Sequence, residues 1–248
     1  MKKLWLIAIV IPLFATGLFA EKKDVMFNAS DGFALKGTFY SPDKVGPGIL
    51  MLHQCNADRA IYDHVATMLS AAGYNVLTFD FRGFGGSKSG EYTDFDRQRD
   101  KILGKMPEDV ENALNFLTSQ STVNKVSLGV VGGSCGVNQS VQAAHRHPEI
   151  KALVLLSGAT DADGEAFIRN SPKLPILGAA SEEDTQAAAS IKKLMSLSTN
   201  KDSQLEMFKD AGHAASMFAK QPDLEADIVI FFRSNLAIGG YGFKPALK

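Results

Sequence analysis

From residue 25 onward, short apolar runs alternate with longer amphipathic segments, and this alternation limits the fold more than any other feature of the sequence. A run such as residues 48–52 is apolar at every position, as expected of a strand that is covered on both faces in a parallel sheet. The expected strands are residues 25–27, 33–40, 48–52, 75–79, 126–131, 152–156, 174–177 and 204–208. Apolar residues at helical spacing predict helices within residues 61–72, 110–117, 137–144 and 224–232.

This order of elements predicts an α/β fold with one central sheet. Because each crossover between parallel strands must return over the sheet, we expect a mostly parallel sheet of about eight strands with helices on both faces. The first two strands are separated by turn residues at 28–32 and should form an antiparallel hairpin at the edge. Residues 91–105 carry charges of both signs and predict a solvated loop that leads into a helix. In such sheets the chemistry lies at the carboxyl ends of the strands.

Residues 132–136, Gly-Gly-Ser-Cys-Gly, form a G-x-S-x-G motif between a predicted strand and a predicted helix. A serine on such a turn has a strained backbone, and the glycines two residues away let the strand and the helix pass closely. Ser134 is therefore the candidate nucleophile. Cys135 as nucleophile would need a glycine two residues later, where Val137 stands.

A serine hydroxyl needs a neighbouring base to take its proton, and the chain has only five histidines. His213 lies in a loop between the last predicted strand and the last helix, from which a side chain can reach the carboxyl edge of the sheet. His145 and His147 lie at the end of the helix after the motif, where a histidine interacts favourably with the helix terminus, and His64 lies in a surface helix. His213 is therefore the candidate base.

Three acidic residues follow the strand predicted at 174–177, in the region expected to supply the carboxylate that orients the histidine. We choose Asp184 for this role. Glu182, Glu183 and Asp184 are also suited to cap the next helix, because acidic side chains favour a helix N-terminus. Asp161, after the preceding strand, is the remaining alternative.

With these residues the sequence resembles the α/β-hydrolase superfamily across nearly the whole chain after residue 20, especially dienelactone-hydrolase-like proteins and small serine esterases. The order Ser134, Asp184, His213 matches that superfamily. Three further segments resemble it: Leu52-His53-Gln54, the segment Asp80-Phe81-Arg82-Gly83-Phe84-Gly85-Gly86-Ser87, and Gly212-His213.

The resemblance implies an oxyanion hole made of two backbone amides. One comes from the residue after the nucleophile, Cys135, and the other from the loop after the third strand, where Gln54 is the first choice and Cys55 the runner-up. It also places both cysteines at the rim of one pocket, which makes a disulfide between Cys55 and Cys135 sterically feasible. The competing interpretation is two separate buried thiols.

The resemblance further implies hydrolysis of a small-molecule ester through an acyl-enzyme, with thioester or peptide cleavage open to the same machinery, and neither cofactor nor metal. It gives Asp80 and Arg82 a structural role in bracing loops. About 17 residues separate the sixth and seventh predicted strands, too few for a large cap domain, so we expect an open pocket.

The first 20 residues have the arrangement of a secretory signal peptide: Lys2 and Lys3, an apolar run to about Leu18, and Ala20 before a charged stretch. We expect cleavage after Ala20, a hydrolase domain over residues 21–248, and a periplasmic or secreted location. An uncleaved N-terminus anchoring the chain in the inner membrane is the alternative. The apolar run is shorter than the roughly 20 residues that a bilayer span needs, so no stable span is expected in the mature chain.

Charge and composition exclude some other classes. A formal net charge of −1 gives no positive field to hold nucleic acid. No linker or repeat divides the chain, and nothing in it indicates an oligomeric state. Two rival functions are an exported binding protein that has kept the fold without catalysis, and a thiol-based redox protein, which the absence of a Cys-x-x-Cys motif disfavours.

Overall fold

The computed structural model describes residues 21–238, and the predicted signal peptide lies outside these residues. Within them, eight strands form one sheet in the order β1-β2-β4-β3-β5-β6-β7-β8. The strands are β1 (Glu21–Asn28), β2 (Ala34–Ser41), β3 (Gly46–Leu52), β4 (Asn75–Phe79), β5 (Val123–Gly133), β6 (Ile150–Leu156), β7 (Ile176–Ser181) and β8 (Gln204–Phe208). From β4 to β8 across the sheet every pair of neighbours is parallel, which confirms the predicted α/β-hydrolase-type architecture.

The first two strands form the predicted antiparallel hairpin, but only β1 lies at the edge of the sheet. The second strand also pairs with β4, antiparallel, from Gly37 to Tyr40. The prediction of two edge strands is therefore wrong for β2. Every residue of β2 after Lys36 is buried, as this inner position requires.

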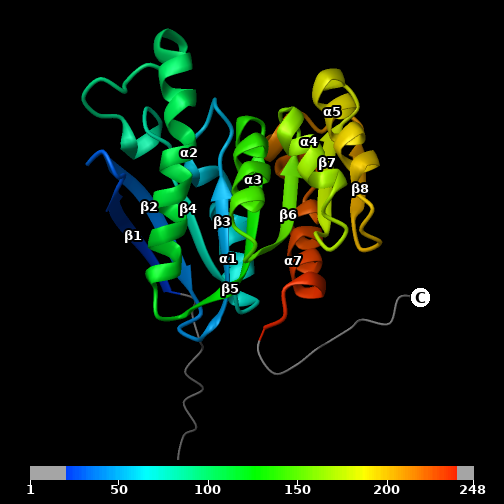
Figure 1. Ribbon diagram of the computed structural model, residues 1–248, viewed down its shortest axis with the longest axis horizontal. Helices are drawn as coiled ribbons and strands as arrows, with labels where there is room; N and C mark the ends of the chain where they lie inside the picture. Colours follow the sequence, from blue (N-terminus) through cyan, green and yellow to red (C-terminus); the bar gives the residue numbers. More distant parts are fainter. Residues whose placement is uncertain (1–20, 239–248) are drawn as a thin grey trace, which may run out of the picture.

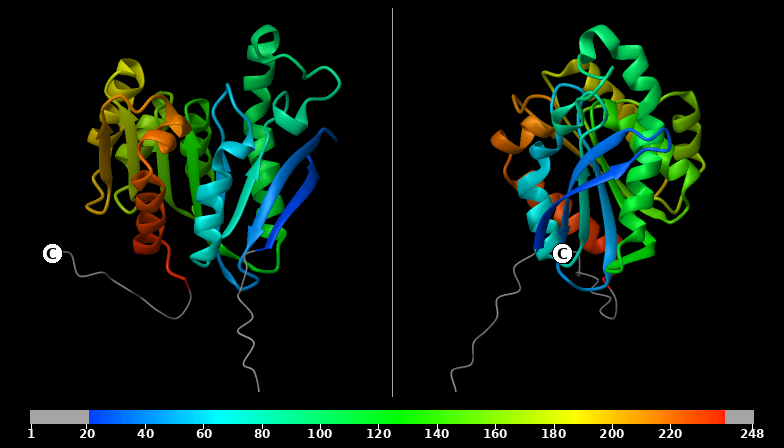
Figure 2. Two further views of the ribbon diagram at one scale, coloured as in Figure 1. Left: turned by 180° about the vertical axis from the view of Figure 1, so that it is seen from behind. Right: turned by 90° about the vertical axis from the view of Figure 1, so that its left-hand side faces the viewer.

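Helices cover both faces of the sheet (Figures 1 and 2). One face carries α1 (Asp63–Ala71) and α7 (Asp223–Asn235), whose apolar side chains share a buried cluster with Ile49 and Val154 of the sheet. The other face carries α2 (Phe95–Ser119), α3 (Cys135–Arg146), α4 (Ala162–Arg169) and α5 (Thr185–Leu197). A short helix, α6 (Met217–Lys220), precedes α7.

The prediction of a loop over residues 91–105 is wrong from Phe95 onward, because helix α2 begins there. Asp94 caps it by accepting a hydrogen bond from the Arg97 amide at 3.2 Å. The charged side chains that obscured the pattern lie on its solvent side, while Ile102 and Met106, four residues apart, are buried against the sheet.

The connection between β6 and β7 holds only the eight-residue helix α4, so no cap domain covers the carboxyl edge of the sheet there, as predicted. Within residues 21–238, no helix has both the length and the apolar character that crossing a membrane requires. The loops after β3, β4, β5, β7 and β8 meet at the carboxyl edge, at the top of Figure 1.

Candidate active site

Ser134 lies on the turn between β5 and α3 with φ of 52° and ψ of −115°, a strained conformation for a residue other than glycine. Its amide donates a 2.9 Å hydrogen bond to the Leu156 carbonyl of β6, which fixes the turn on the sheet. A Cβ at Gly132 would lie 2.2 Å from Ser140 Oγ, and one at Gly136 would lie 2.5 Å from the Leu52 carbonyl oxygen. Both glycines of the motif are therefore required by close packing around the serine.

The structure brings His213 and Asp184 into direct contact. His213 Nδ1 lies 2.5 Å from Asp184 Oδ2, although the two residues belong to the separate loops that follow β8 and β7. Ser134 and His213 line the same hollow, of about 370 Å³, together with Cys55 and Cys135. This arrangement leaves the other ring nitrogen of His213 available to the hollow.

The loop that carries His213 has three left-handed residues, Asp210, Gly212 and Ala214, with φ of 52°, 92° and 50°. Such backbone persists only where its surroundings hold it, because each non-glycine residue of this kind costs about 1–3 kcal/mol. Several contacts hold this loop. Lys220 Nζ donates to the Asp210 carbonyl at 2.7 Å, and the Ser216 hydroxyl accepts from the His213 amide at 2.7 Å.

Glu183 is the main anchor of this loop, which sequence reasoning missed. Its carboxylate accepts from the Asp210 amide at 2.9 Å and from the Gly212 amide at 2.6 Å. Ser181 Oγ donates to the same carboxylate and accepts from the Ala211 amide at 2.8 Å. The hydrogen bond from Ser181 is the largest of the effects that lower the pKa of Glu183 to about 2. Glu183 is thus an anionic anchor for the loop before the histidine, rather than a helix cap.

Cys55 and Cys135 form a disulfide with a Cα–Cα distance of 5.9 Å, as the resemblance allowed. The bond joins the loop after β3 to the first residue of α3, directly after Ser134. Beside it, Gln54 Oε1 accepts from the Ala215 amide at 3.0 Å, so the loop after β3 is also tied to the loop that carries the histidine. Gln54, Cys55 and Cys135 thus lie together at the edge where an oxyanion hole is expected.

The other candidate residues have different partners. Asp161 caps α4 by accepting from the Gly164 amide at 2.9 Å. His64 pairs with Glu225 across α1 and α7, His145 stacks on a phenylalanine, and His147 lies 2.7 Å from Glu111. The structure brings none of these four side chains to Ser134.

Asp80 and Arg82 brace loops, as expected. Asp80 accepts from the Gly86 amide at 2.7 Å and from Arg59. Arg82 is fully buried and donates through Nε to Asp109 at 2.8 Å and through Nη1 to Asp31 at 2.7 Å. His53, also from the resembling segments, is buried and accepts from the Phe81 amide at 3.1 Å, and burial lowers its pKa.

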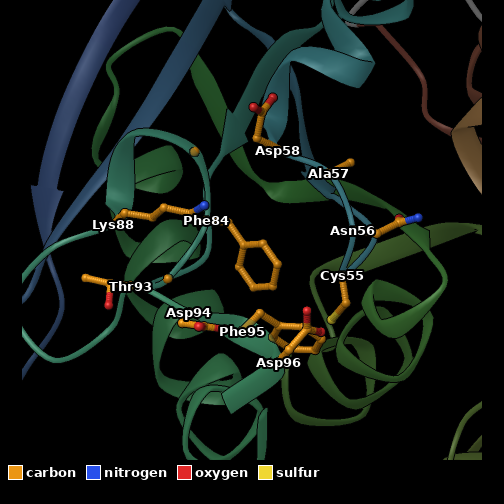
Figure 3. A pocket seen from close by; sticks show the side chains of 12 residues that line it. Cys55, Asn56, Ala57, Asp58, Phe84, Lys88, Thr93, Asp94, Phe95 and Asp96 are labelled. Atoms are coloured by element: carbon orange, nitrogen blue, oxygen red, sulfur yellow. The ribbon is translucent and has the colours of Figure 1, made fainter. Parts of the chain in front are cut away.

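A second hollow of about 550 Å³ adjoins the first and shares Cys55, Asn56, Phe95 and Asp96 with it. Figure 3 shows the side chains that line it, from the loops after β3 and β4 and from the start of α2. Within residues 21–238, no three His, Cys, Asp or Glu side chains gather as a metal-binding cluster would require.

A family profile described as the dienelactone hydrolase family matches residues 35–227, most of the chain and every residue of this site. The chain belongs to the dienelactone hydrolase family. A dienelactone hydrolase from Anabaena variabilis superposes with a TM-score of 0.72 at 20% identity, covering 88% of this chain and 100% of that one. The esterase Pf2001 of Pyrococcus furiosus gives a TM-score of 0.68 at 21% identity, over 89% of this chain and 95% of that one.

Curated proteins of similar sequence match this member of the dienelactone hydrolase family over only part of their length. An uncharacterized protein of Mycobacterium tuberculosis is 29% identical over 164 residues, 65% of this chain and 54% of that protein. The thiohydrolase apmlB of Arthrinium phaeospermum is 29% identical over 136 residues, 54% of this chain and 42% of that protein. The chain therefore spans about half the length of the curated relatives it matches.

Proposed function

We propose that this chain is an exported serine hydrolase that cleaves a carboxylic ester. The proposal rests above all on one arrangement: Ser134 on its strained turn lines the same hollow as His213, which lies 2.5 Å from Asp184. A nucleophile and a base that line one hollow, with an acid in contact with the base, are the parts that acyl transfer to water needs. Membership of the dienelactone hydrolase family supports the same reaction class.

In the first half of the reaction, Ser134 Oγ attacks the ester carbonyl carbon while His213 Nε2 takes the hydroxyl proton. Asp184 holds the ring through Nδ1 and stabilises the imidazolium that forms. The carbonyl oxygen becomes an oxyanion, which the backbone amides of Cys135 and Gln54, or Cys55 in place of Gln54, would hold. Collapse of the intermediate breaks the bond to the alcohol oxygen, which leaves with the proton from His213.

In the second half, a water molecule attacks the acyl group on Ser134, again giving its proton to His213. Collapse releases the carboxylic acid and returns the proton to Ser134 Oγ. Every step uses side chains and amides of this chain, and the substrate is a small molecule that enters an uncapped hollow.

The disulfide supports the exported location, because disulfides persist in oxidising compartments such as the periplasm. On this proposal residues 1–20 are removed after Ala20 and residues 21–248 form the hydrolase domain. Mass spectrometry of the chain purified from periplasmic or culture fractions tests it. A mass starting at Glu21 is expected, and a chain retained in the inner membrane with Met1 in place would favour the anchored alternative.

The hydrolase proposal is tested with p-nitrophenyl acetate and its thioester analogue, using the wild type and Ser134→Ala. The variant should lose about a thousandfold or more in kcat, because the oxyanion amides and the binding site remain while the nucleophile is gone. Faster turnover of the thioester would shift the proposal towards the activity named for the thiohydrolase relative. No turnover by the wild type on either substrate would favour the non-catalytic binding protein.

A further inference from the structure

The second hollow is continuous with the one at Ser134, because Cys55, Asn56, Phe95 and Asp96 line both. A substrate with its carbonyl at Ser134 can therefore extend into a space of about 550 Å³. Nothing in the proposed reaction uses that space. Its lining should indicate which part of a substrate it receives.

The lining offers polar groups with free hydrogen-bonding capacity. Lys88, Thr93 and Asp96 of the second hollow, and Arg99 of the first, are exposed, so the hydrogen-bonding groups of their side chains are open to a ligand. Asn56 Oδ1 accepts a hydrogen bond from Gln54 Nε2 at 2.6 Å, which leaves the side-chain amide protons of Asn56 for other partners. The second hollow, called the groove below, thus presents donors and acceptors side by side.

This mixture excludes two kinds of occupant. A long alkyl chain would displace water from Lys88, Thr93 and Asp96 without replacing the hydrogen bonds, and each unmatched group would weaken binding. An anionic occupant would meet three carboxylates, those of Asp58, Asp94 and Asp96, against the single ammonium of Lys88. A neutral group that both donates and accepts hydrogen bonds fits all of these side chains.

Aromatic rings supply an apolar surface within the polar groove. Phe84 and Phe95 lie with ring centroids 5.0 Å apart, and Figure 3 shows Phe84 in the hollow with Phe95 beside Asp96 and Cys55. A ring face packs against C–H surfaces, while the polar groups around it take hydroxyls. Sugars present both kinds of surface on one molecule.

We propose that this groove binds the alcohol part of the substrate, and that this part is a sugar or a similar polyol carrying a short acyl group. The inference rests on the proposed ester hydrolysis at Ser134. Hydrolysis then breaks the acyl–oxygen bond: water supplies the hydroxyl of the released acid, and the sugar oxygen regains a proton through His213. Asp96, at the junction of the two hollows, accepts hydrogen bonds from the sugar hydroxyls.

The test compares two acetates that differ in their hydroxyls: methyl glucoside acetylated at its primary hydroxyl, and cyclohexylmethyl acetate. Because the sugar ester can add hydrogen bonds in the groove, its kcat/KM should be roughly tenfold or more higher. Equal values, or a preference for the cyclohexyl ester, would overturn the inference.

The variant Asp96→Asn tests whether the preference for the sugar ester arises in the groove. It should lower kcat/KM for the sugar ester by roughly tenfold, since a hydrogen bond to a charged acceptor is lost, and leave the cyclohexyl ester nearly unchanged. Asp163→Asn is the matched control, because Asp163 is also an exposed acid in the first turn of a helix, α4. Equal loss on both esters would overturn the role given to Asp96.

A binding measurement separates this inference from the proposed reaction. Saturation-transfer NMR with unacetylated methyl glucoside should show contact with Ser134→Ala protein, and the signal should fall in Ser134→Ala combined with Asp96→Asn. If no ester is cleaved, the proposed hydrolysis is wrong, and this signal alone still shows whether the groove binds a sugar. Absence of the signal would overturn the inference even if p-nitrophenyl acetate is cleaved.

Discussion

At the scale of single residues, the orientation of the His213 ring depends on one carboxylate oxygen. Asp184 Oδ2 lies 2.5 Å from Nδ1, so the ring presents its other nitrogen to the hollow that Ser134 lines. Sequence order and the resemblance led to the choice of Asp184 as the partner of His213. They did not show what Glu183 does, because adjacent acids in one turn differ only in the direction of their side chains.

Asp184→Asn tests this residue assignment. An asparagine of the same size can donate to Nδ1 and thereby fix the wrong tautomer, so kcat for p-nitrophenyl acetate should fall by about a thousandfold to ten-thousandfold with little loss of stability. Asp161→Asn serves as control, because Asp161 caps α4. A normal kcat in Asp184→Asn would remove Asp184 from the mechanism.

Glu206 of β8 makes stability depend on pH. Burial, with a smaller contribution from the charge of Asp227, raises its pKa from 4.5 to about 7, and its Oε2 has no hydrogen-bond partner in residues 21–238. The unfolded chain therefore releases this proton at lower pH than the folded one, so the folded state loses stability as pH rises from about 4.5 to 7.

Glu206→Gln should therefore raise the melting temperature at pH 8 by roughly 2–4 °C, the shift expected for about 1 kcal/mol in a chain of this size. The gain should disappear at pH 4, where Glu206 is protonated in both states. Scanning calorimetry of both proteins at the two pH values measures it. A gain of equal size at pH 4 would refute the ionisation argument.

At the scale of elements, strands were easier to predict than the loops between them. β4, which is apolar at Val76, Leu77 and Phe79, and β8, in which Leu205 and Met207 alternate with polar residues, have the predicted bounds. The first part of α2 was missed, since its charged solvent face dominates the local sequence. The Glu183 anchor was missed for another reason: it exists only once β7 and β8 pair with Ser181 opposite Phe208, a register that the sequence does not display.

Glu183→Gln tests the loop anchor that this pairing creates. Removing the charge weakens the hold on the amides of Asp210 and Gly212, so His213 should be less well placed and kcat should fall by roughly tenfold or more, with KM little changed. In the NMR spectrum of this variant, the downfield resonance of the proton on His213 Nδ1 should also be lost.

Glu182→Gln is the matched control for this variant, since it removes the same charge from the exposed neighbouring residue. It should leave kcat and the resonance unchanged. If Glu183→Gln lowers the melting temperature alone, with kcat and the resonance intact, Glu183 has only a structural role.

At the scale of the whole molecule, the disulfide joins residues 80 positions apart and ties the loop after β3 to the start of α3. Sequence distance alone would never pair Cys55 with Cys135; the resemblance brought them together by placing their loops at one edge of a sheet. The bond restricts the unfolded chain and, in the folded chain, spans the two segments that should supply the oxyanion amides.

Replacing both cysteines by serine should lower the free energy of unfolding by about 4 kcal/mol on the chain-entropy account, measured by urea denaturation. The backbone amides remain, so residual esterase activity is expected, with kcat reduced. Dithiothreitol should destabilise the wild type by a similar amount and leave the double variant unaffected. An unchanged wild type after verified reduction would contradict this role for the bond.

The central claim is that Ser134 is activated as a nucleophile by His213, and covalent labelling tests it most directly. The wild type treated with diethyl p-nitrophenyl phosphate should gain one diethylphosphoryl group, located on Ser134 by peptide mass spectrometry, while Ser134→Ala and His213→Ala should gain none. A label on another residue, or the same label in His213→Ala at the wild-type rate, would contradict the account.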